Sequence, residues 1–224
     1  MSHTLRSLKA LMWKDIQTEL RGGRFVLSSL AFGILLILVV GMALDGSSRL
    51  PASFAAGLLW LNLFFSTAIS MGRHDAKDRE MGGILGMLLT PVDRSLIFYA
   101  KWMTTLLFVV VAELGMLGAF FIILNEPLPV RLGAFALVML AGTMGLTGIG
   151  TFLATLTANS SMRDILIPLL LFPLCIPMFL SLIQLTVFSL GAAAQTGVWL
   201  EVLIGYLVVL AVLPWLLYEP LMEV

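Results

Sequence analysis

The chain has 224 residues, of which 60% are apolar and 12% charged, and its formal net charge is zero. Soluble domains carry about 25% charged residues, so this composition excludes a water-exposed surface over most of the chain and predicts lipid as its solvent. The zero net charge gives no argument for nucleic-acid binding. The single cysteine, Cys175, excludes an intramolecular disulfide and a CxxC redox pair.

The first expected element is an amphipathic helix over residues 4–21. Its apolar side chains recur three or four residues apart, on one helical face: Leu5, Leu8, Met12, Ile16 and Leu20. Charged residues occupy the other faces, and Gly22-Gly23 ends the helix. We expect an interfacial helix that lies on the lipid headgroups, a place compatible with a coupling role.

Six stretches are apolar enough to cross a bilayer core of about 30 Å, which needs roughly 20 helical residues. They are residues 25–44, 51–72, 102–124, 132–157, 165–190 and 198–218. Lys and Arg concentrate before the first stretch and between the second and third, so the positive-inside rule places both termini in the cytoplasm. The sequence therefore predicts one all-α integral membrane domain over residues 1–224.

The segment between spans two and three, residues 73–100, is expected to be cytoplasmic. It begins with RHDAKDRE and then becomes apolar, with Met81, Ile84, Leu85 and Leu88 along one helical face. Pro91 disfavours helical geometry at Thr90, so a short helix should end near Leu89. Asp93 is suited to cap a new helix that enters span three. A bare linker needs only a few residues, so the length of this segment favours docking of a partner over a passive connection.

Within the spans, Glu113 is the main candidate for a functional side chain, because an acid inside a membrane is costly. It lines a substrate path or makes a structural hydrogen bond to a neighbouring helix, and the sequence leaves both open. Gly142, Gly145 and Gly148 are typical of close helix packing. Three prolines in span five, Pro168, Pro173 and Pro177, predict kinks that are either static or part of a moving element.

Motifs of covalent catalysis and of nucleotide binding are missing from the sequence. It has no Gly-Lys pair, and therefore no GxxxxGK[ST] loop. Its two histidines, His3 and His74, are not spaced as metal ligands. We therefore expect no catalytic residues, no metal site and no cofactor bound by this chain.

The run DREMGGILGMLLTPVDRSLIFYAKW, residues 78–102, resembles the haem exporter protein B (CcmB) family, which are membrane subunits of the bacterial cytochrome c maturation system. The family pattern falls on Asp78, Glu80, Gly82, Gly86, Leu88, Leu89, Pro91, Asp93, Arg94, Ser95 and Lys101. Two further stretches match in style and position: the N-terminal Trp13-Lys14-Asp15 with Glu19-Leu20-Arg21, and the proline-rich residues 167–177. Met81 and Leu85 stand where many relatives have acids, and the tryptophan-rich motif of haem-handling members of that system is absent.

The resemblance implies a permease subunit of ABC-2 type exporter architecture, with a cytoplasmic coupling helix between spans two and three. Its implied partners are a CcmA-like ATPase that carries ATP and Mg²⁺, a second copy of itself, CcmC-, CcmD- and CcmE-like proteins, and the lipid of a bacterial inner membrane. The implied ATPase-coupling contacts are Arg73, Asp75, Asp78, Arg79, Glu80, Gly82, Gly86, Leu88, Pro91, Asp93 and Arg94. The implied work is haem delivery at the outer face, either by moving haem, the possible cargo, or by releasing the haem-loaded chaperone, and the residues leave both open.

Other functions are compatible with parts of the pattern. An ABC-2 permease for a lipid, glycan or drug would have the same layout. A secondary transporter would need several ionisable residues at mid-bilayer, and an intramembrane enzyme would need clustered catalytic groups. A passive scaffold that holds partners together is a further alternative.

Overall fold

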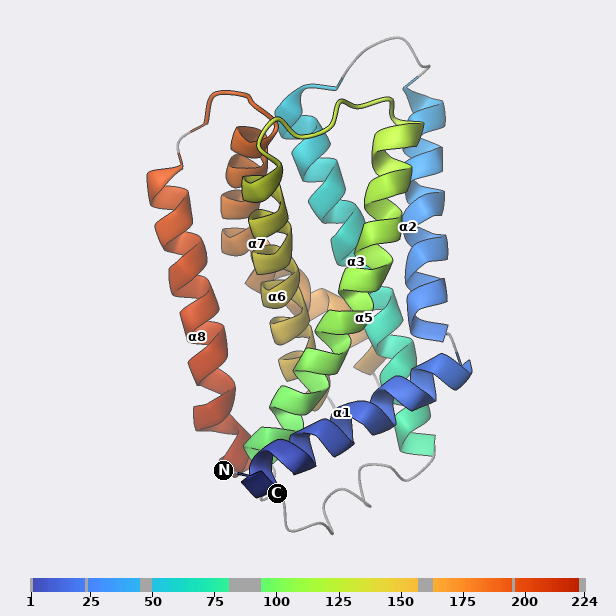
Figure 1. Ribbon diagram of the computed structural model, residues 1–224, viewed down its shortest axis with the longest axis vertical. Coiled ribbons are helices and arrows are strands. Elements are labelled where there is room, and N and C mark those ends of the chain that lie inside the picture. The colour runs from blue at the N-terminus through green and yellow to red at the C-terminus, as the bar shows by residue number, and fades with distance from the viewer. Residues whose placement is uncertain are drawn as a thin grey trace.

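The computed structural model describes residues 2–22, 24–44, 50–80, 94–156, 163–194 and 196–221. The elements in these ranges are helices: α1 (Ser2–Gly22), α2 (Arg24–Ala43), α3 (Ala52–Glu80), α5 (Arg94–Ile123), α6 (Leu132–Leu156), α7 (Arg163–Ser189) and α8 (Gly197–Leu221). Helices α2 to α8 run along the long axis of the molecule, and α1 lies across one end of them (Figure 1). We call this end, where α3 ends and α5 begins, the α1 end.

Five of these helices are long and apolar enough to cross a membrane, over Phe25–Ala43, Ala52–Ile69, Leu96–Ile123, Leu132–Thr155 and Leu169–Ser189. In α8 the apolar stretch found among the described side chains is Gly197–Val212. The protein is therefore an all-helical, multi-pass membrane protein. Large apolar side chains are exposed on its outside, for example Leu35, Val39 and Met42 of α2, as expected of a surface that faces lipid.

Helix α6 lies in the core of the bundle, where it contacts α3, α5, α7 and α8. Its glycines allow this close approach, because each lies against a large side chain of a different helix. Gly142 lies against Trp60 of α3, Gly145 against Met178 of α7 and Gly148 against Trp102 of α5. The packing role expected for these glycines is therefore observed, and it involves three different helices.

One helix differs from the sequence-based expectation. The charged residues 73–80 continue α3 without a break, whereas we expected them to begin a separate short helix. The physical reason is that RHDAKDRE holds Ala, Arg, Lys and Glu, which are good helix formers, and has no Gly or Pro to stop the helix. By contrast, α5 begins at Arg94, directly after the expected cap Asp93, as predicted for the helix that enters the third span.

The proline-rich α7 is one continuous helix that includes Pro173 and Pro177. Hydroxyl groups donate to backbone carbonyls in this stretch: Tyr206 of α8 to Leu174 at 2.6 Å, and Ser181 to Pro177 at 3.2 Å. Such bonds satisfy backbone acceptors where water is scarce. Cys175, in the same stretch, is fully buried.

Candidate functional site

The helices that flank residues 81–93 are both longer than a bilayer core. α3 has 29 residues and α5 has 30, which correspond to about 43 and 45 Å at 1.5 Å per residue. The hydrocarbon core is about 30 Å thick, and the apolar window of α3 ends at Ile69. The last turns of α3 therefore extend beyond the hydrocarbon at the α1 end, the end of the bundle at which α5 also begins (Figure 1).

The expected ATPase-coupling residues divide into two groups. Those with a described backbone are Arg73, Asp75, Asp78, Arg79 and Glu80, in the last two turns of α3, and Arg94, the first residue of α5. The other five, Gly82, Gly86, Leu88, Pro91 and Asp93, lie outside the described residues. The coupling contacts expected of both groups stay predictions.

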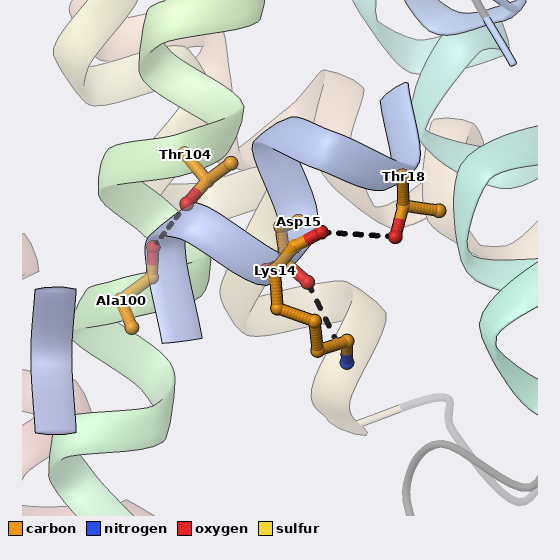
Figure 2. Close-up of polar contacts among 5 residues, drawn as sticks. All are labelled: Lys14, Asp15, Thr18, Ala100 and Thr104. Carbon is orange, nitrogen blue, oxygen red and sulfur yellow. Dashed lines mark hydrogen bonds and ion pairs between the residues drawn. The ribbon is translucent and has the colours of Figure 1, made fainter. Parts of the chain in front are cut away.

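At the same end, α1 packs across α5. Asp15 and Glu19 of α1 are buried, with 6% and 7% of their surface exposed. Figure 2 shows the turn of α1 that carries Asp15 beside Thr104 and Ala100 of α5, where the Thr104 hydroxyl donates to the Ala100 carbonyl at 2.8 Å. The Lys14 amine lies 3.6 Å from the Asp15 carboxylate, and the Lys14 side chain is 45% exposed. Both acids of this part of α1 thus face the bundle.

Glu19 joins α1 to α2. Its Oε1 atom accepts hydrogen bonds from the backbone N–H groups of Phe25, at 2.7 Å, and Val26, at 3.1 Å. These amides belong to the first turn of α2, where N–H groups have no intrahelical partner, so the carboxylate acts as a cap supplied by the preceding helix. Ile16 packs nearby, against a cluster that includes Phe25 and Val109. The corner between α1 and the first span is therefore closed by both polar and apolar contacts.

Deep in the bundle, Glu113 connects α5 to α6. It is 4% exposed, and its Oε2 atom accepts a hydrogen bond from the Thr143 hydroxyl at 2.6 Å. Its Oε1 atom has no hydrogen-bond partner among the described residues. Glu113 therefore faces the bundle interior, as the sequence predicted, and makes the interhelical hydrogen bond that was one of its two expected roles.

Other polar contacts tie the helices together around Glu113. Asn62 of α3 donates to the Met116 sulfur at 3.7 Å, one turn along α5 from Glu113. Towards the α1 end, Trp102 donates to Thr147 of α6 at 3.2 Å. Between α2 and α3, the Ser29 and Ser66 hydroxyls lie 2.6 Å apart, and Ser66 donates to the Ser29 carbonyl at 2.6 Å.

A cavity of about 130 Å³ lies at the end of the bundle opposite α1. Three phenylalanines, Phe120, Phe121 and Phe135, contribute to its apolar lining, together with Glu126, which accepts a hydrogen bond from Leu50 N–H at 2.9 Å. A cavity of this size holds about one benzene ring, so it does not accommodate a haem macrocycle.

The sequence model of the "CcmB protein" family matches residues 6–217. The chain belongs to the CcmB family. Relatives named "Heme exporter protein B" are similar to it over most of their length. The relative from Rhodobacter capsulatus is 29% identical over 76% of this chain and 78% of its own, and the one from Bradyrhizobium diazoefficiens is 28% identical over 79% of each. A third, from Paracoccus denitrificans, is 27% identical over 76% of this chain. No solved structure matches this CcmB family member.

Membership of the CcmB family confirms the resemblance drawn from residues 78–102. The sequence reasoning assigned no structural role to several residues that organise the site: Asp15, Glu19, Ser29, Ser66 and Thr143. For Asp15 and Glu19 a signal was available, because acids four residues apart share one helical face and Glu19 closely precedes the first span. The Ser29–Ser66 and Glu113–Thr143 pairs join positions far apart in the sequence, and no local pattern reveals them.

Proposed function

We propose that this chain is the membrane-spanning subunit of an ABC-type haem exporter, driven by a separate ATPase subunit. The observation that carries the proposal is the CcmB family match over residues 6–217, together with relatives named "Heme exporter protein B". The all-helical, multi-pass fold supports it. The chain itself supplies the transport helices and is not an enzyme; ATP and Mg²⁺ bind to the partner.

We propose that the protein lies in the inner membrane of a bacterium. Its proposed topology has six spans, an interfacial α1 and both termini in the cytoplasm. α8 supplies the sixth span, since it has 25 residues and an apolar sequence. The ends of α1, α3 and α8 and the start of α5 share one end of the bundle (Figure 1), which the positive-inside rule makes cytoplasmic. This arrangement fits the ABC-2 type exporter architecture.

In this function, the segment from Arg73 to Arg94 is the contact for the ATPase. The support is its place: it contains the charged end of α3, beyond the apolar window that ends at Ile69, and it leads to the start of α5 at the α1 end. Each is a continuous helix, so a displacement of the segment is passed to both. α5 carries Glu113, whose bond to Thr143 links that helix to α6. We propose that Glu113 holds the register of α5 against α6 during the transport cycle.

The proposed role in cytochrome c maturation is one of two steps. The exporter either delivers haem to a chaperone or releases the chaperone once it is loaded with haem. Two copies of this chain and two copies of a CcmA-like ATPase would form the exporter, and CcmC-, CcmD- and CcmE-like proteins would act with it. The cavity lined by Phe120 and Phe135 is smaller than a haem, so the proposal does not place haem in it.

The deciding experiment is co-purification with the ATPase encoded beside this chain and measurement of ATP hydrolysis in proteoliposomes. We expect the double variant Asp93→Ala/Arg94→Ala to insert normally but to lose complex formation or the coupling of hydrolysis to holocytochrome c formation. Glu201→Ala, an exposed acid at the opposite end of the bundle, is the control and should behave as wild type.

Two results would count against parts of the proposal. Unchanged binding and coupling in the double variant would refute the docking role of the segment. An intact complex that hydrolyses ATP but restores no holocytochrome c in a strain lacking its own CcmB protein would refute the haem function. It would favour a permease for a lipid, glycan or drug.

A further inference from the structure

The charges of α1 are sorted between its two sides. Over residues 8–22, whose side chains are described, the acids are Asp15 and Glu19, and both are buried against the bundle. The cations of the same stretch, Lys9, Lys14 and Arg21, are all exposed. The inward side of α1 is thus acidic and the outward side basic, although the helix as a whole carries both signs.

Two large apolar side chains accompany the cations on the outward side. Trp13 is 57% exposed and Leu20 is 76% exposed. At 3.6 residues per turn, Lys9, Trp13 and Leu20 share one strip of the helix, and Lys14, Gln17 and Arg21 form the adjacent strip. We call these six side chains the outward surface of α1. It combines an aromatic ring, an aliphatic side chain and three cations, and has no acid.

The position of α1 decides what this surface meets. Glu19 caps the first turn of α2 through the amides of Phe25 and Val26, and the apolar span of α2 begins at Phe25. The cap therefore holds α1 at the depth where the hydrocarbon begins, and α1 lies across the long axis of the bundle (Figure 1). At this depth, exposed Trp and Leu are stabilised by lipid, while Lys and Arg extend to the headgroups.

We propose that the outward surface of α1 is a binding site for anionic phospholipid headgroups. Lys9, Lys14 and Arg21 contact the phosphates, and Trp13 and Leu20 lie among the upper acyl chains. The Lys14–Asp15 contact of 3.6 Å leaves the Lys14 side chain almost half exposed, so the side chain still reaches a headgroup. A protein partner would need an acidic surface that also accepts exposed Trp and Leu at membrane depth, and the position of α1 favours lipid. The inference depends on the membrane fold and not on cargo or ATPase.

The test uses the full chain in nanodiscs of phosphatidylcholine that contain a minor fraction of acyl-brominated lipid, either phosphatidylglycerol or phosphatidylcholine. The chain has five tryptophans, so the signal of Trp13 is taken as the difference between wild type and Trp13→Phe. We expect brominated phosphatidylglycerol to quench Trp13 more strongly than brominated phosphatidylcholine at equal mole fraction. Each Lys or Arg near an anionic membrane surface is expected to enrich anionic lipid beside it about fivefold. The triple variant Lys9→Gln/Lys14→Gln/Arg21→Gln should therefore lose the stronger quenching by phosphatidylglycerol.

Three matched variants keep the test falsifiable. Lys9→Arg/Lys14→Arg retains the charge and should retain the preference, whereas Gln17→Lys adds a cation to the same surface and should increase it. Arg131→Gln removes a cation at the opposite end of the bundle and should leave the lipid preference in Trp13 quenching unchanged. Equal quenching by both lipids in wild type would overturn the proposal. A second result would also overturn it: neither lipid quenches Trp13, and addition of the partner ATPase protects Trp13 from quenching by aqueous iodide. The outward surface of α1 would then be a protein contact.

Discussion

The indole ring of Trp60 occupies the space that a side chain on Gly142 would fill. Trp60 belongs to α3 and Gly142 to α6, and the indole N–H donates to the Thr186 hydroxyl of α7 at 2.9 Å. Leu182 of α7 also lies 2.8 Å from the position of a Cβ on Gly142. Three helices therefore meet at one glycine, and their separation there depends on the absence of a side chain.

Replacing this glycine should destabilise the bundle. Gly142→Ala places a methyl group against Trp60 and Leu182, and overpacking of this kind costs about 1–3 kcal/mol, more than the gain of up to about 1 kcal/mol from the higher helix propensity of Ala. We expect a lower midpoint of thermal unfolding in detergent. Gly118→Ala in α5 is the matched control, since nothing lies within 4 Å of its Cβ position, and it should be neutral or stabilising. Equal effects of the two changes would contradict the packing account.

The Glu113–Thr143 hydrogen bond should be measurable as a coupling energy. Glu113→Leu and Thr143→Val each remove one partner, and their effects on the free energy of unfolding should be non-additive by about 0.6–2 kcal/mol, the range found for hydrogen bonds between membrane helices. Unfolding in mixed micelles is the measurement. Glu113→Gln and Thr143→Ser retain an acceptor and a donor and should keep most of the coupling. Strict additivity would show that the bond contributes nothing.

The stabilisation of the start of α2 by Glu19 should depend on its hydrogen-bond acceptor and not on its charge alone. Glu19→Ala removes the acceptor for Phe25 and Val26 N–H, and loss of a helix cap costs typically about 1 kcal/mol. Hydrogen exchange at these two amides should accelerate several-fold, while Glu19→Gln should retain most of the protection. Gln17→Ala, at an exposed position of the same helix, controls for general effects on α1. Unchanged exchange in Glu19→Ala would exclude the cap.

At the opposite end, Arg131 should hold α7 against the start of α6. Its guanidinium lies 3.9 Å from the centre of the Phe188 ring and donates to the Phe188 carbonyl at 2.7 Å. Arg131→Ala should accelerate hydrogen exchange at residues 190–192. Arg131→Lys should have a smaller effect, because an amine keeps the charge but cannot stack as a plane. The backbone bond from Arg131 N–H to the Ser189 carbonyl remains in both variants, and equal exchange in all three proteins would contradict the prediction.

Much of the fold follows from hydrophobic length. Each of the six expected spans corresponds to one helix, because a bilayer imposes a minimum apolar length that few other structures satisfy. Residue types that act locally were also informative: α5 begins at Arg94, as expected from Pro91 and Asp93. Local reasoning was wrong where two rules competed. The charged end of α3 was assigned to a separate helix because charge marks the limit of a span, but charge does not end a helix.

The amphipathic pattern of α1 was a partial guide. The apolar residues Ile16 and Leu20 were placed on one face, and in the structure Ile16 packs on the bundle while Leu20 is 76% exposed. The inward face is instead centred on Asp15 and Glu19. Their burial depends on the amides of α2 and on packing against α5, and the periodicity of α1 alone does not reveal these contacts. The same holds for Glu113: its burial was predictable from membrane depth, but its partner Thr143 comes from another helix.

Cys175 has a practical consequence for labelling studies. It is the only cysteine of the chain and lies fully buried within α7, and buried thiols are chemically inert. The natural sequence is therefore expected to stay unlabelled by a membrane-impermeant maleimide, without any prior replacement of native residues. Two single variants, Lys9→Cys and Gly133→Cys, would place one reactive thiol at each end of the bundle. Labelling of each variant would show which end is accessible from which side of the membrane.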